Sequence, residues 1–301
     1  MEQYEKEYAD YFMLPRTLTN GLRVYPFKLK EYEKYKGLVE KYILLDITRL
    51  NNFKKQEFTK LKQERKIKRN AKFEYLPYGT LFEYLTAVLE QYRNTDLTIA
   101  RILQSSEEER QMLYEQNPNL ESVVNSYIPS NMEEELCDLF SYVLKQIVTY
   151  NYEEKAFFIY EIKDGKNSLL CKITEDNFEE LRVCILDQNL IFEPIVPNSY
   201  KGAQIIKKAM QKLSERSEET SFLAMVSAVS IYSGKSDAEL MEYTYYRLLF
   251  DFEMVNRFNG NIFNAIFMSQ GSKEAKITPL NKVFKAPNPY DSIFGGVNIN
   301  L

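Results

Sequence analysis

The side chains here that could do chemistry are 43 acidic residues, three cysteines and one Gly-Lys-Ser sequence. Histidine is absent, which excludes Ser-His-Asp and Cys-His catalysis and any histidine-ligated metal. Cys137, Cys171 and Cys184 form no Cys-x-x-Cys pair, so we expect small buried side chains rather than a zinc site. A carboxylate-bound Mg²⁺ enzyme needs neither residue type, but no motif indicates one. We expect no catalytic residues, no metal and no cofactor.

The Gly-Lys-Ser sequence lies in residues 233–236 and ends like a phosphate-binding loop. That loop requires a glycine five positions before Gly234, where this chain has Val229, and a preceding strand, whereas the pattern here is helical. A DNA-reading helix-turn-helix has the same outline, but the second helix is mostly Tyr, Leu and Phe, with Arg247 as its first basic residue. We predict an ordinary helical hairpin, with Gly234 ending one helix and Ser236 beginning the next.

A basic run occupies residues 54–72, with nine Lys or Arg and two Glu in a chain whose net charge is −4. We predict a solvated helix face or a loop. Such a run could neutralise phosphates of a nucleic acid, but it shows no aromatic interleaving typical of single-strand binding. It could instead complement an acidic stretch at 105–121, in this chain or another copy. We favour protein contact, with Lys66, Lys68 and Arg69 as partner-binding residues.

Length and composition indicate a packed protein of about two domains. The 301 residues are 45% hydrophobic, and no apolar stretch is long enough for a signal peptide or a membrane span. An odd number of cysteines fits a reducing compartment. Aromatic residues reach 14%, which suits a protein that contacts other proteins, although an AT-rich genome would produce the same enrichment.

Hydrophobic periodicity predicts a mainly α fold of helical, bundle-like domains. A long amphipathic helix should cover 32–50, and an exposed acidic helix should end near Asn117. Other helices are expected near 205–213, 222–231 and 262–268. Serine or threonine paired with a glutamate three residues later predicts three further helix starts: Thr80 with Glu83, Ser130 with Glu133, and Ser236 with Glu239. The helix after Ser236 should reach about Arg257 and lie centrally, because it is apolar on nearly every face.

Two small β-hairpins are expected, near 17–25 and 156–173, with turns at Asn20-Gly21 and Asp164-Gly165. The second hairpin should lead into a helix capped by Thr174, whose buried stripe would hold Phe178, Leu181, Ile185 and Leu186.

We expect an N-terminal hairpin and helical domain at 1–150, a second hairpin and helical domain at 151–271, and an extended arm at 272–301. The arm has too little apolar surface to fold alone, so it should lie on the body or dock a partner. Its partner-binding residues would be Ile293, Phe294, Gly295, Gly296 and Val297, where the glycines allow close backbone approach.

Two stretches resemble a known group of proteins. The first is residues 172–182 (KITEDNFEELR), with Ile185 and Gln188-Asn189. The second is 229–236 (VSIYSGKS), followed by 243–248 (YTYYRL) and 251–252 (DF). Together they resemble the tail assembly chaperones and baseplate-hub assembly proteins of contractile-tailed bacteriophages. The resemblance covers roughly residues 157–268, and the basic run and the arm have no counterpart in it.

The resemblance implies a non-enzymatic role in virion morphogenesis, as an assembly factor or a retained virion subunit. Its partners would be other phage tail or baseplate proteins or a second copy of the chain, in the host cytoplasm or the virion tail, with no membrane contact. The alternative is a nucleic-acid-associated protein that uses the basic run.

Overall fold

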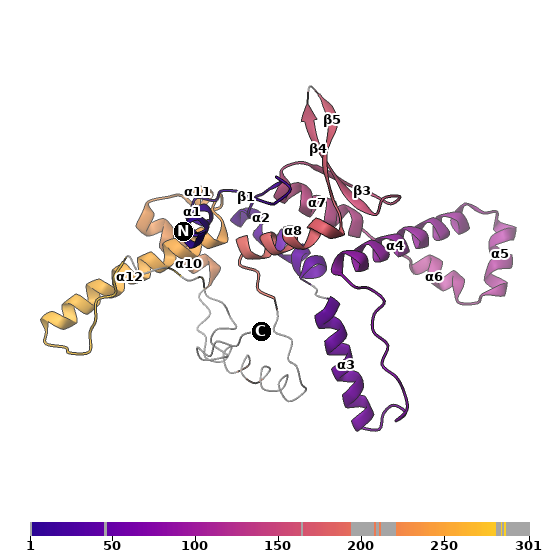
Figure 1. The fold of residues 1–301 in the computed structure, drawn as a ribbon, viewed down its shortest axis with the longest axis horizontal. Coiled ribbons are helices and arrows are strands. Elements are labelled where there is room, and N and C mark those ends of the chain that lie inside the picture. The colour runs from indigo at the N-terminus through magenta and orange to yellow at the C-terminus, as the bar shows by residue number, and fades with distance from the viewer. Residues whose placement is uncertain are drawn as a thin grey trace. The chain divides into compact units, whose positions relative to one another are not determined.

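The computed structural model describes residues 2–44, 47–163, 165–193, 221–280 and the single residues 208, 211, 284 and 286. The described chain is mainly helical, with two small antiparallel sheets, as predicted (Figure 1). It forms two compact units. Unit 1 takes the described residues within 1–44, 49–75 and 180–301, and unit 2 those within 45–48 and 76–179. The division predicted after residue 150 falls inside strand β3 (Ile147–Asn151), whose residues pair with the next strand. The division predicted after residue 271 falls inside unit 1.

Unit 2 contains helices α4 to α7, a three-stranded sheet and the start of α8. Their bounds are α4 Leu81–Gln104, α5 Glu107–Gln116, α6 Leu120–Ser126, α7 Met132–Leu144, β3 Ile147–Asn151, β4 Ala156–Lys163, β5 Lys166–Ile173 and α8 Glu175–Gln188. The predicted second hairpin is confirmed as β4 and β5, and β3 adds a strand that the sequence pattern did not indicate. Four buried phenylalanines form the aromatic core: Phe82, Phe140, Phe157 and Phe178.

Unit 1 begins with α1 Glu2–Tyr11 and a hairpin of β1 Arg16–Thr17 and β2 Arg23–Val24. The predicted hairpin is confirmed, but its turn is longer than two residues. The Leu18 N–H donates to the Leu22 carbonyl, and the Gly21 N–H donates to the Leu18 carbonyl. Gly21 has a φ of +84°, so a three-residue loop closes on a left-handed glycine.

The predicted helix at 32–50 is interrupted. Helix α2 spans Leu29–Leu38 and continues as a π-helical turn, η1, at Val39–Ile43, where the Leu44 N–H donates five positions back to the Val39 carbonyl. Residues 45–46 lie outside the described part, and α3 follows at Ile47–Gln63. At the end of η1 the buried Arg182 donates its Nε–H to the Ile43 carbonyl at 2.6 Å. A helix-end carbonyl thus receives a charged donor, which offsets the cost of burying that cation.

The capping boxes predicted from serine or threonine and a following glutamate can be compared with the observed helix starts. The boxes at Thr80/Glu83 and Ser236/Glu239 are present, and Ser106 with Glu109 forms another. The box predicted at Ser130/Glu133 is wrong: α7 begins after Asn131, because Ser130 accepts from the nearer Met132 N–H and the Glu133 carboxylate accepts from the Tyr152 hydroxyl at 2.6 Å. At α8, the Asn177 side chain accepts from the Thr174 N–H. The predicted buried stripe of α8 is confirmed: Phe178, Leu181, Ile185 and Leu186.

The C-terminal part of unit 1 contains α10 Phe222–Ser233, α11 Asp237–Leu240 and α12 Tyr245–Ser269. Gly234 ends α10 in the left-handed conformation, as predicted. The single helix expected from Ser236 to Arg257 is wrong, because the chain breaks between α11 and α12. There the Leu29 N–H donates to the Tyr243 carbonyl and Thr244 bridges to Lys28, so residues 241–244 pair with an N-terminal segment. The helix expected at 262–268 is the end of α12.

The core of unit 1 joins α2, α10, α11 and the beginning of α12. Its buried members are Leu29, Met225, Val226, Val229, Leu240, Tyr243 and Leu248. The expected helix at 205–213 and the arm residues 293–297 lie outside the described residues. Among the helices that are described, none combines the length and the apolar character needed to cross a membrane.

Candidate interaction site

The predicted partner-binding residues of the basic run lie just beyond α3. Lys66, Lys68 and Arg69 are exposed, and Lys66 forms an ion pair with Glu64 at 2.9 Å. The arm residues Ile293, Phe294, Gly295, Gly296 and Val297 lie outside the described part of the chain and stay a prediction. The structure therefore tests the placement of the basic run only.

The chain reverses direction at the end of α3. Arg65 adopts a φ of +56° and donates to the Lys62 carbonyl, while Lys66 donates to the Leu61 carbonyl. These two bonds, three and five positions back, form a Schellman motif, which usually has glycine at its left-handed position. The next segment then runs back beside α3 (Figure 1). The basic run was predicted as a helix face or a loop. Its first part lies on α3 and the rest lies in the segment that follows the helix.

The reversal places aromatic rings among the cations. Phe73 packs edge-on against Phe58 of α3, with ring centroids 5.6 Å apart, and against Tyr75 at 4.9 Å. The Lys55 ammonium lies 5.5 Å from the Tyr75 ring, and that of Lys62 lies 5.4 Å from the Phe58 ring. We call these five residues the basic–aromatic surface. The expectation of no aromatic interleaving is wrong, because the two rings that complete the surface come from beyond residue 72.

The second exposed surface is the distal half of α12, which no sequence signal separated from the buried half. Within α12 the buried residues are Tyr246 and Leu248, whereas the apolar side chains toward the C-terminus are exposed. They are Phe258, Ile262, Phe263, Ile266, Phe267 and Met268. Phe263 is 61% exposed. The expected central position therefore holds for the first half of α12 only.

After α12 the chain also reverses direction and runs back beside its helix. Gly271, with a φ of +90°, donates to the Met268 carbonyl, and Ser272 donates to the Phe267 carbonyl. The Asn261 side chain then accepts from the Thr278 N–H and donates to the Thr278 carbonyl, both at 2.7 Å. Residues 258–272 contain no ionisable side chain. We call the exposed apolar residues of this half the distal α12 surface.

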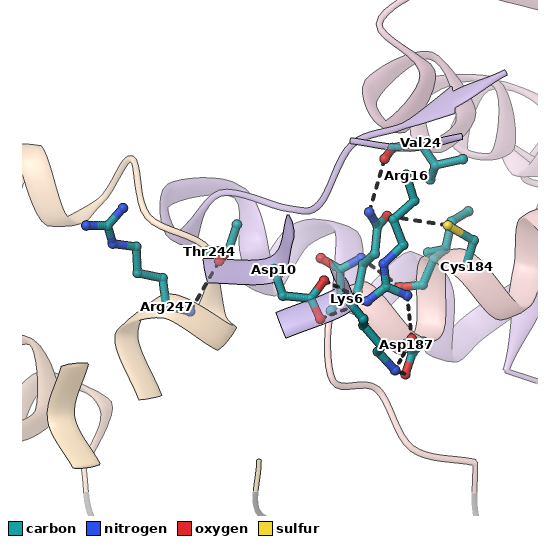
Figure 2. A network of polar contacts seen from close by, with 11 residues as sticks. Lys6, Asp10, Arg16, Val24, Cys184, Asp187, Thr244 and Arg247 are labelled. Carbon is teal, nitrogen blue, oxygen red and sulfur yellow. Dashed lines mark hydrogen bonds and ion pairs between the residues drawn. The ribbon is translucent and has the colours of Figure 1, made fainter. Parts of the chain in front are cut away.

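A polar network joins α1, β1 and α8 (Figure 2). Arg16 donates to Asp10 at 2.6 and 2.8 Å and to Asp187, which also binds Lys6. Burial raises the pKa of Asp10 despite the nearby guanidinium. At Asp187 burial would raise the pKa, but hydrogen bonds from Lys6 and Arg16 outweigh it and lower the pKa. Two cations balance two carboxylates, so the arrangement serves to hold α1 and β1 on α8.

The cysteines lack the properties of nucleophiles or ligands. Burial raises the pKa of the Cys137 thiol to about 12 and that of Cys184 to about 11, and it also raises the pKa of Cys171. A thiol with such a pKa is protonated at neutral pH and reacts slowly. Cys184 is buried as predicted, whereas Cys137 and Cys171 are half-buried. Across the described residues no three His, Cys, Asp or Glu side chains cluster as a metal site would require.

The last two residues of the first resembling stretch hold the N-terminal segment in place. Gln188 donates to the Val24 carbonyl, and the Asn189 side chain accepts from the Phe27 N–H at 2.7 Å. Both side chains are buried, so these residues act in packing. A comparison with known protein families, curated proteins and solved structures finds no match for this chain.

Proposed function

We propose that this chain is a non-enzymatic morphogenesis protein of a contractile-tailed bacteriophage, which binds other tail or baseplate proteins. Two lines of reasoning support the proposal. The stretches at 172–182 and 229–252 resemble assembly proteins of that group, and the distal half of α12 exposes six apolar side chains to solvent. The observation that carries it is the distal α12 surface.

Exposed apolar residues scattered singly are common on proteins, but a contiguous group on one helix is typical of a contact surface. Phe263 and Phe267 lie one turn apart, as do Ile262 and Ile266, so the four side chains form one stripe. Aromatic residues and methionine are enriched in the cores of protein interfaces. Because residues 258–272 carry no charge, the surface suits an apolar partner face rather than a charged one.

The experiment is affinity purification of the tagged full-length chain from infected cells. The test variant is Ile262→Ser with Ile266→Ser, and we expect it to lose at least tenfold in recovered tail or baseplate proteins. The control is Ile128→Ser with Ile162→Ser, which removes two isoleucines of unit 2 that are more exposed than Ile262 and Ile266, and it should leave recovery unchanged.

Circular dichroism and thermal unfolding of both double variants check that they fold. Equal recovery with both pairs would remove the distal α12 surface from the proposal. Failure of the wild-type chain to recover any tail or baseplate protein would contradict the proposed function itself.

A further inference from the structure

The basic run holds more positive charge than its ion pairs within the described residues neutralise. Its ion pairs within the described residues join Lys60 and Lys66 to Glu64. Six of the other cations are exposed, and none of them forms an ion pair among the described residues: Lys54, Lys55, Arg65, Lys68, Arg69 and Lys72. Exposed, unneutralised cations at this density attract polyanions, and the attraction weakens with salt.

Exposed aromatic rings accompany this charge. Tyr75 is 55% exposed, and Phe73 holds it edge-on rather than covering it. Lys55 lies over the Tyr75 ring, where it can also meet a phosphate. Recognition of single-stranded nucleic acid has two components: aromatic rings on which bases stack, and cations that follow the phosphate backbone. Both are present here.

Arg65 places one of these exposed cations at the left-handed turn that ends α3. A left-handed residue at the end of a helix is cheapest as glycine, and a side chain there costs about 1 kcal/mol. The chain places a cation at this turn, between α3 and the segment that carries Phe73 and Tyr75.

We propose that the basic–aromatic surface, together with the exposed cations of residues 54–72, binds single-stranded nucleic acid. The cations contact phosphates, and a base stacks on Tyr75. A duplex hides its base faces and meets the charges alone, so it binds more weakly. An acidic protein surface, such as the exposed helix α5 of another copy, would also use the charges alone and would not need Tyr75.

The test is fluorescence anisotropy of the full-length chain with labelled dT₂₀ and U₂₀, the corresponding duplexes, and a peptide of residues 105–121, titrated from 50 to 200 mM salt. Tyr75→Ala should weaken single-strand binding about tenfold and leave the salt dependence unchanged. Tyr75→Phe keeps a ring and should bind as the wild type. The matched control is Tyr92→Ala, an exposed tyrosine of unit 2 that should have no effect.

Lys68→Gln with Arg69→Gln should weaken binding and reduce the slope of log affinity against log salt by about 1.4, since each single-strand phosphate contact contributes about 0.7. The proposal is overturned by absence of binding at 50 mM salt, by equal affinity for duplex, or by an unaltered affinity in Tyr75→Ala. Preference for the acidic peptide over both oligonucleotides would assign the surface to a protein partner. The Ile262→Ser/Ile266→Ser variant should bind oligonucleotides normally, which separates this test from that of the proposed function.

Discussion

Helices α3 and α12 end in the same backbone motif but present different chemistry. Arg65 is the left-handed residue after α3, and Gly271 is the left-handed residue after α12. In both cases this residue and the next donate to carbonyls three and five positions back, and the chain then returns beside its helix. The segment after α3 brings aromatic rings next to the cations of that helix, whereas the segment after α12 leaves an uncharged row of apolar side chains exposed.

The difference shows that the backbone motif determines where a surface forms, while the side chains determine what it can bind. Apolar contacts do not weaken as salt is added, whereas phosphate contacts weaken strongly. The two surfaces should therefore respond to different conditions, and so should the two helix ends that carry them.

The largest effect should separate the two halves of α12. Leu248→Ala removes a fully buried side chain from the core of unit 1 and should lower the free energy of unfolding by about 2–5 kcal/mol. Ile262→Ala truncates an exposed side chain and should cost less than about 1 kcal/mol. Urea denaturation of the two variants measures both. Similar losses would mean that the distal half is packed, and the contrast between α3 and α12 would then disappear.

A smaller effect should result from exchanging the left-handed residues. Gly271→Ala forces a side chain into a φ of +90° and should destabilise the end of α12 by about 1 kcal/mol. Arg65→Gly relieves the same strain after α3, partly offset by the greater freedom of glycine in the unfolded chain. Hydrogen exchange at the Ser272 and Lys66 amides reports each motif. We expect exchange to become about fivefold faster at Ser272 and modestly slower at Lys66; changes in the reverse directions would contradict the assigned motifs.

The smallest effect is a pH dependence expected at the end of α3 but not at the end of α12. The hydrogen bond from Lys66 lowers the pKa of Glu64. A carboxyl group whose pKa is lower in the folded chain stabilises it above the ordinary value of about 4.3, and this contribution is lost as pH falls through the folded pKa. Residues 258–272 have no ionisable group, so the end of α12 should be insensitive over the same range.

A carboxyl titration by NMR checks this prediction, with Lys66→Gln as the control that should return the Glu64 pKa toward its ordinary value. An ordinary pKa in the wild-type chain would exclude the Lys66 contact from the end of α3.

Local signals in the sequence predicted much of the fold. The hairpin glycine Gly21, the cap at Ser236 and the apolar stripe of α8 depend on neighbours within a few residues, so they are readable without tertiary structure. The capping box predicted at Ser130 is wrong because Glu133 accepts a hydrogen bond from Tyr152, which lies 19 residues away. The break before α12 similarly depends on pairing with Lys28, more than 200 residues away.

The candidate surfaces were less predictable than the fold. Charge counting found the basic run, but Phe73 and Tyr75 join it only because the chain reverses at Arg65, a residue that carries no turn signal. Periodicity found α12, but an all-round apolar pattern cannot tell which half meets α10. Which half of α12 is buried and which is exposed depends on where α10 ends, and this follows from tertiary packing rather than from the local sequence.

The π-helical turn at Val39–Ile43 makes this part of the chain sensitive to its length. Each residue added to or removed from a helix rotates the downstream residues by about 100°. Deleting one residue here would swing the Ile43 carbonyl away from Arg182 and leave a buried guanidinium with one acceptor fewer. Indels in this turn should therefore be tolerated far less readily than conservative substitutions at the same positions.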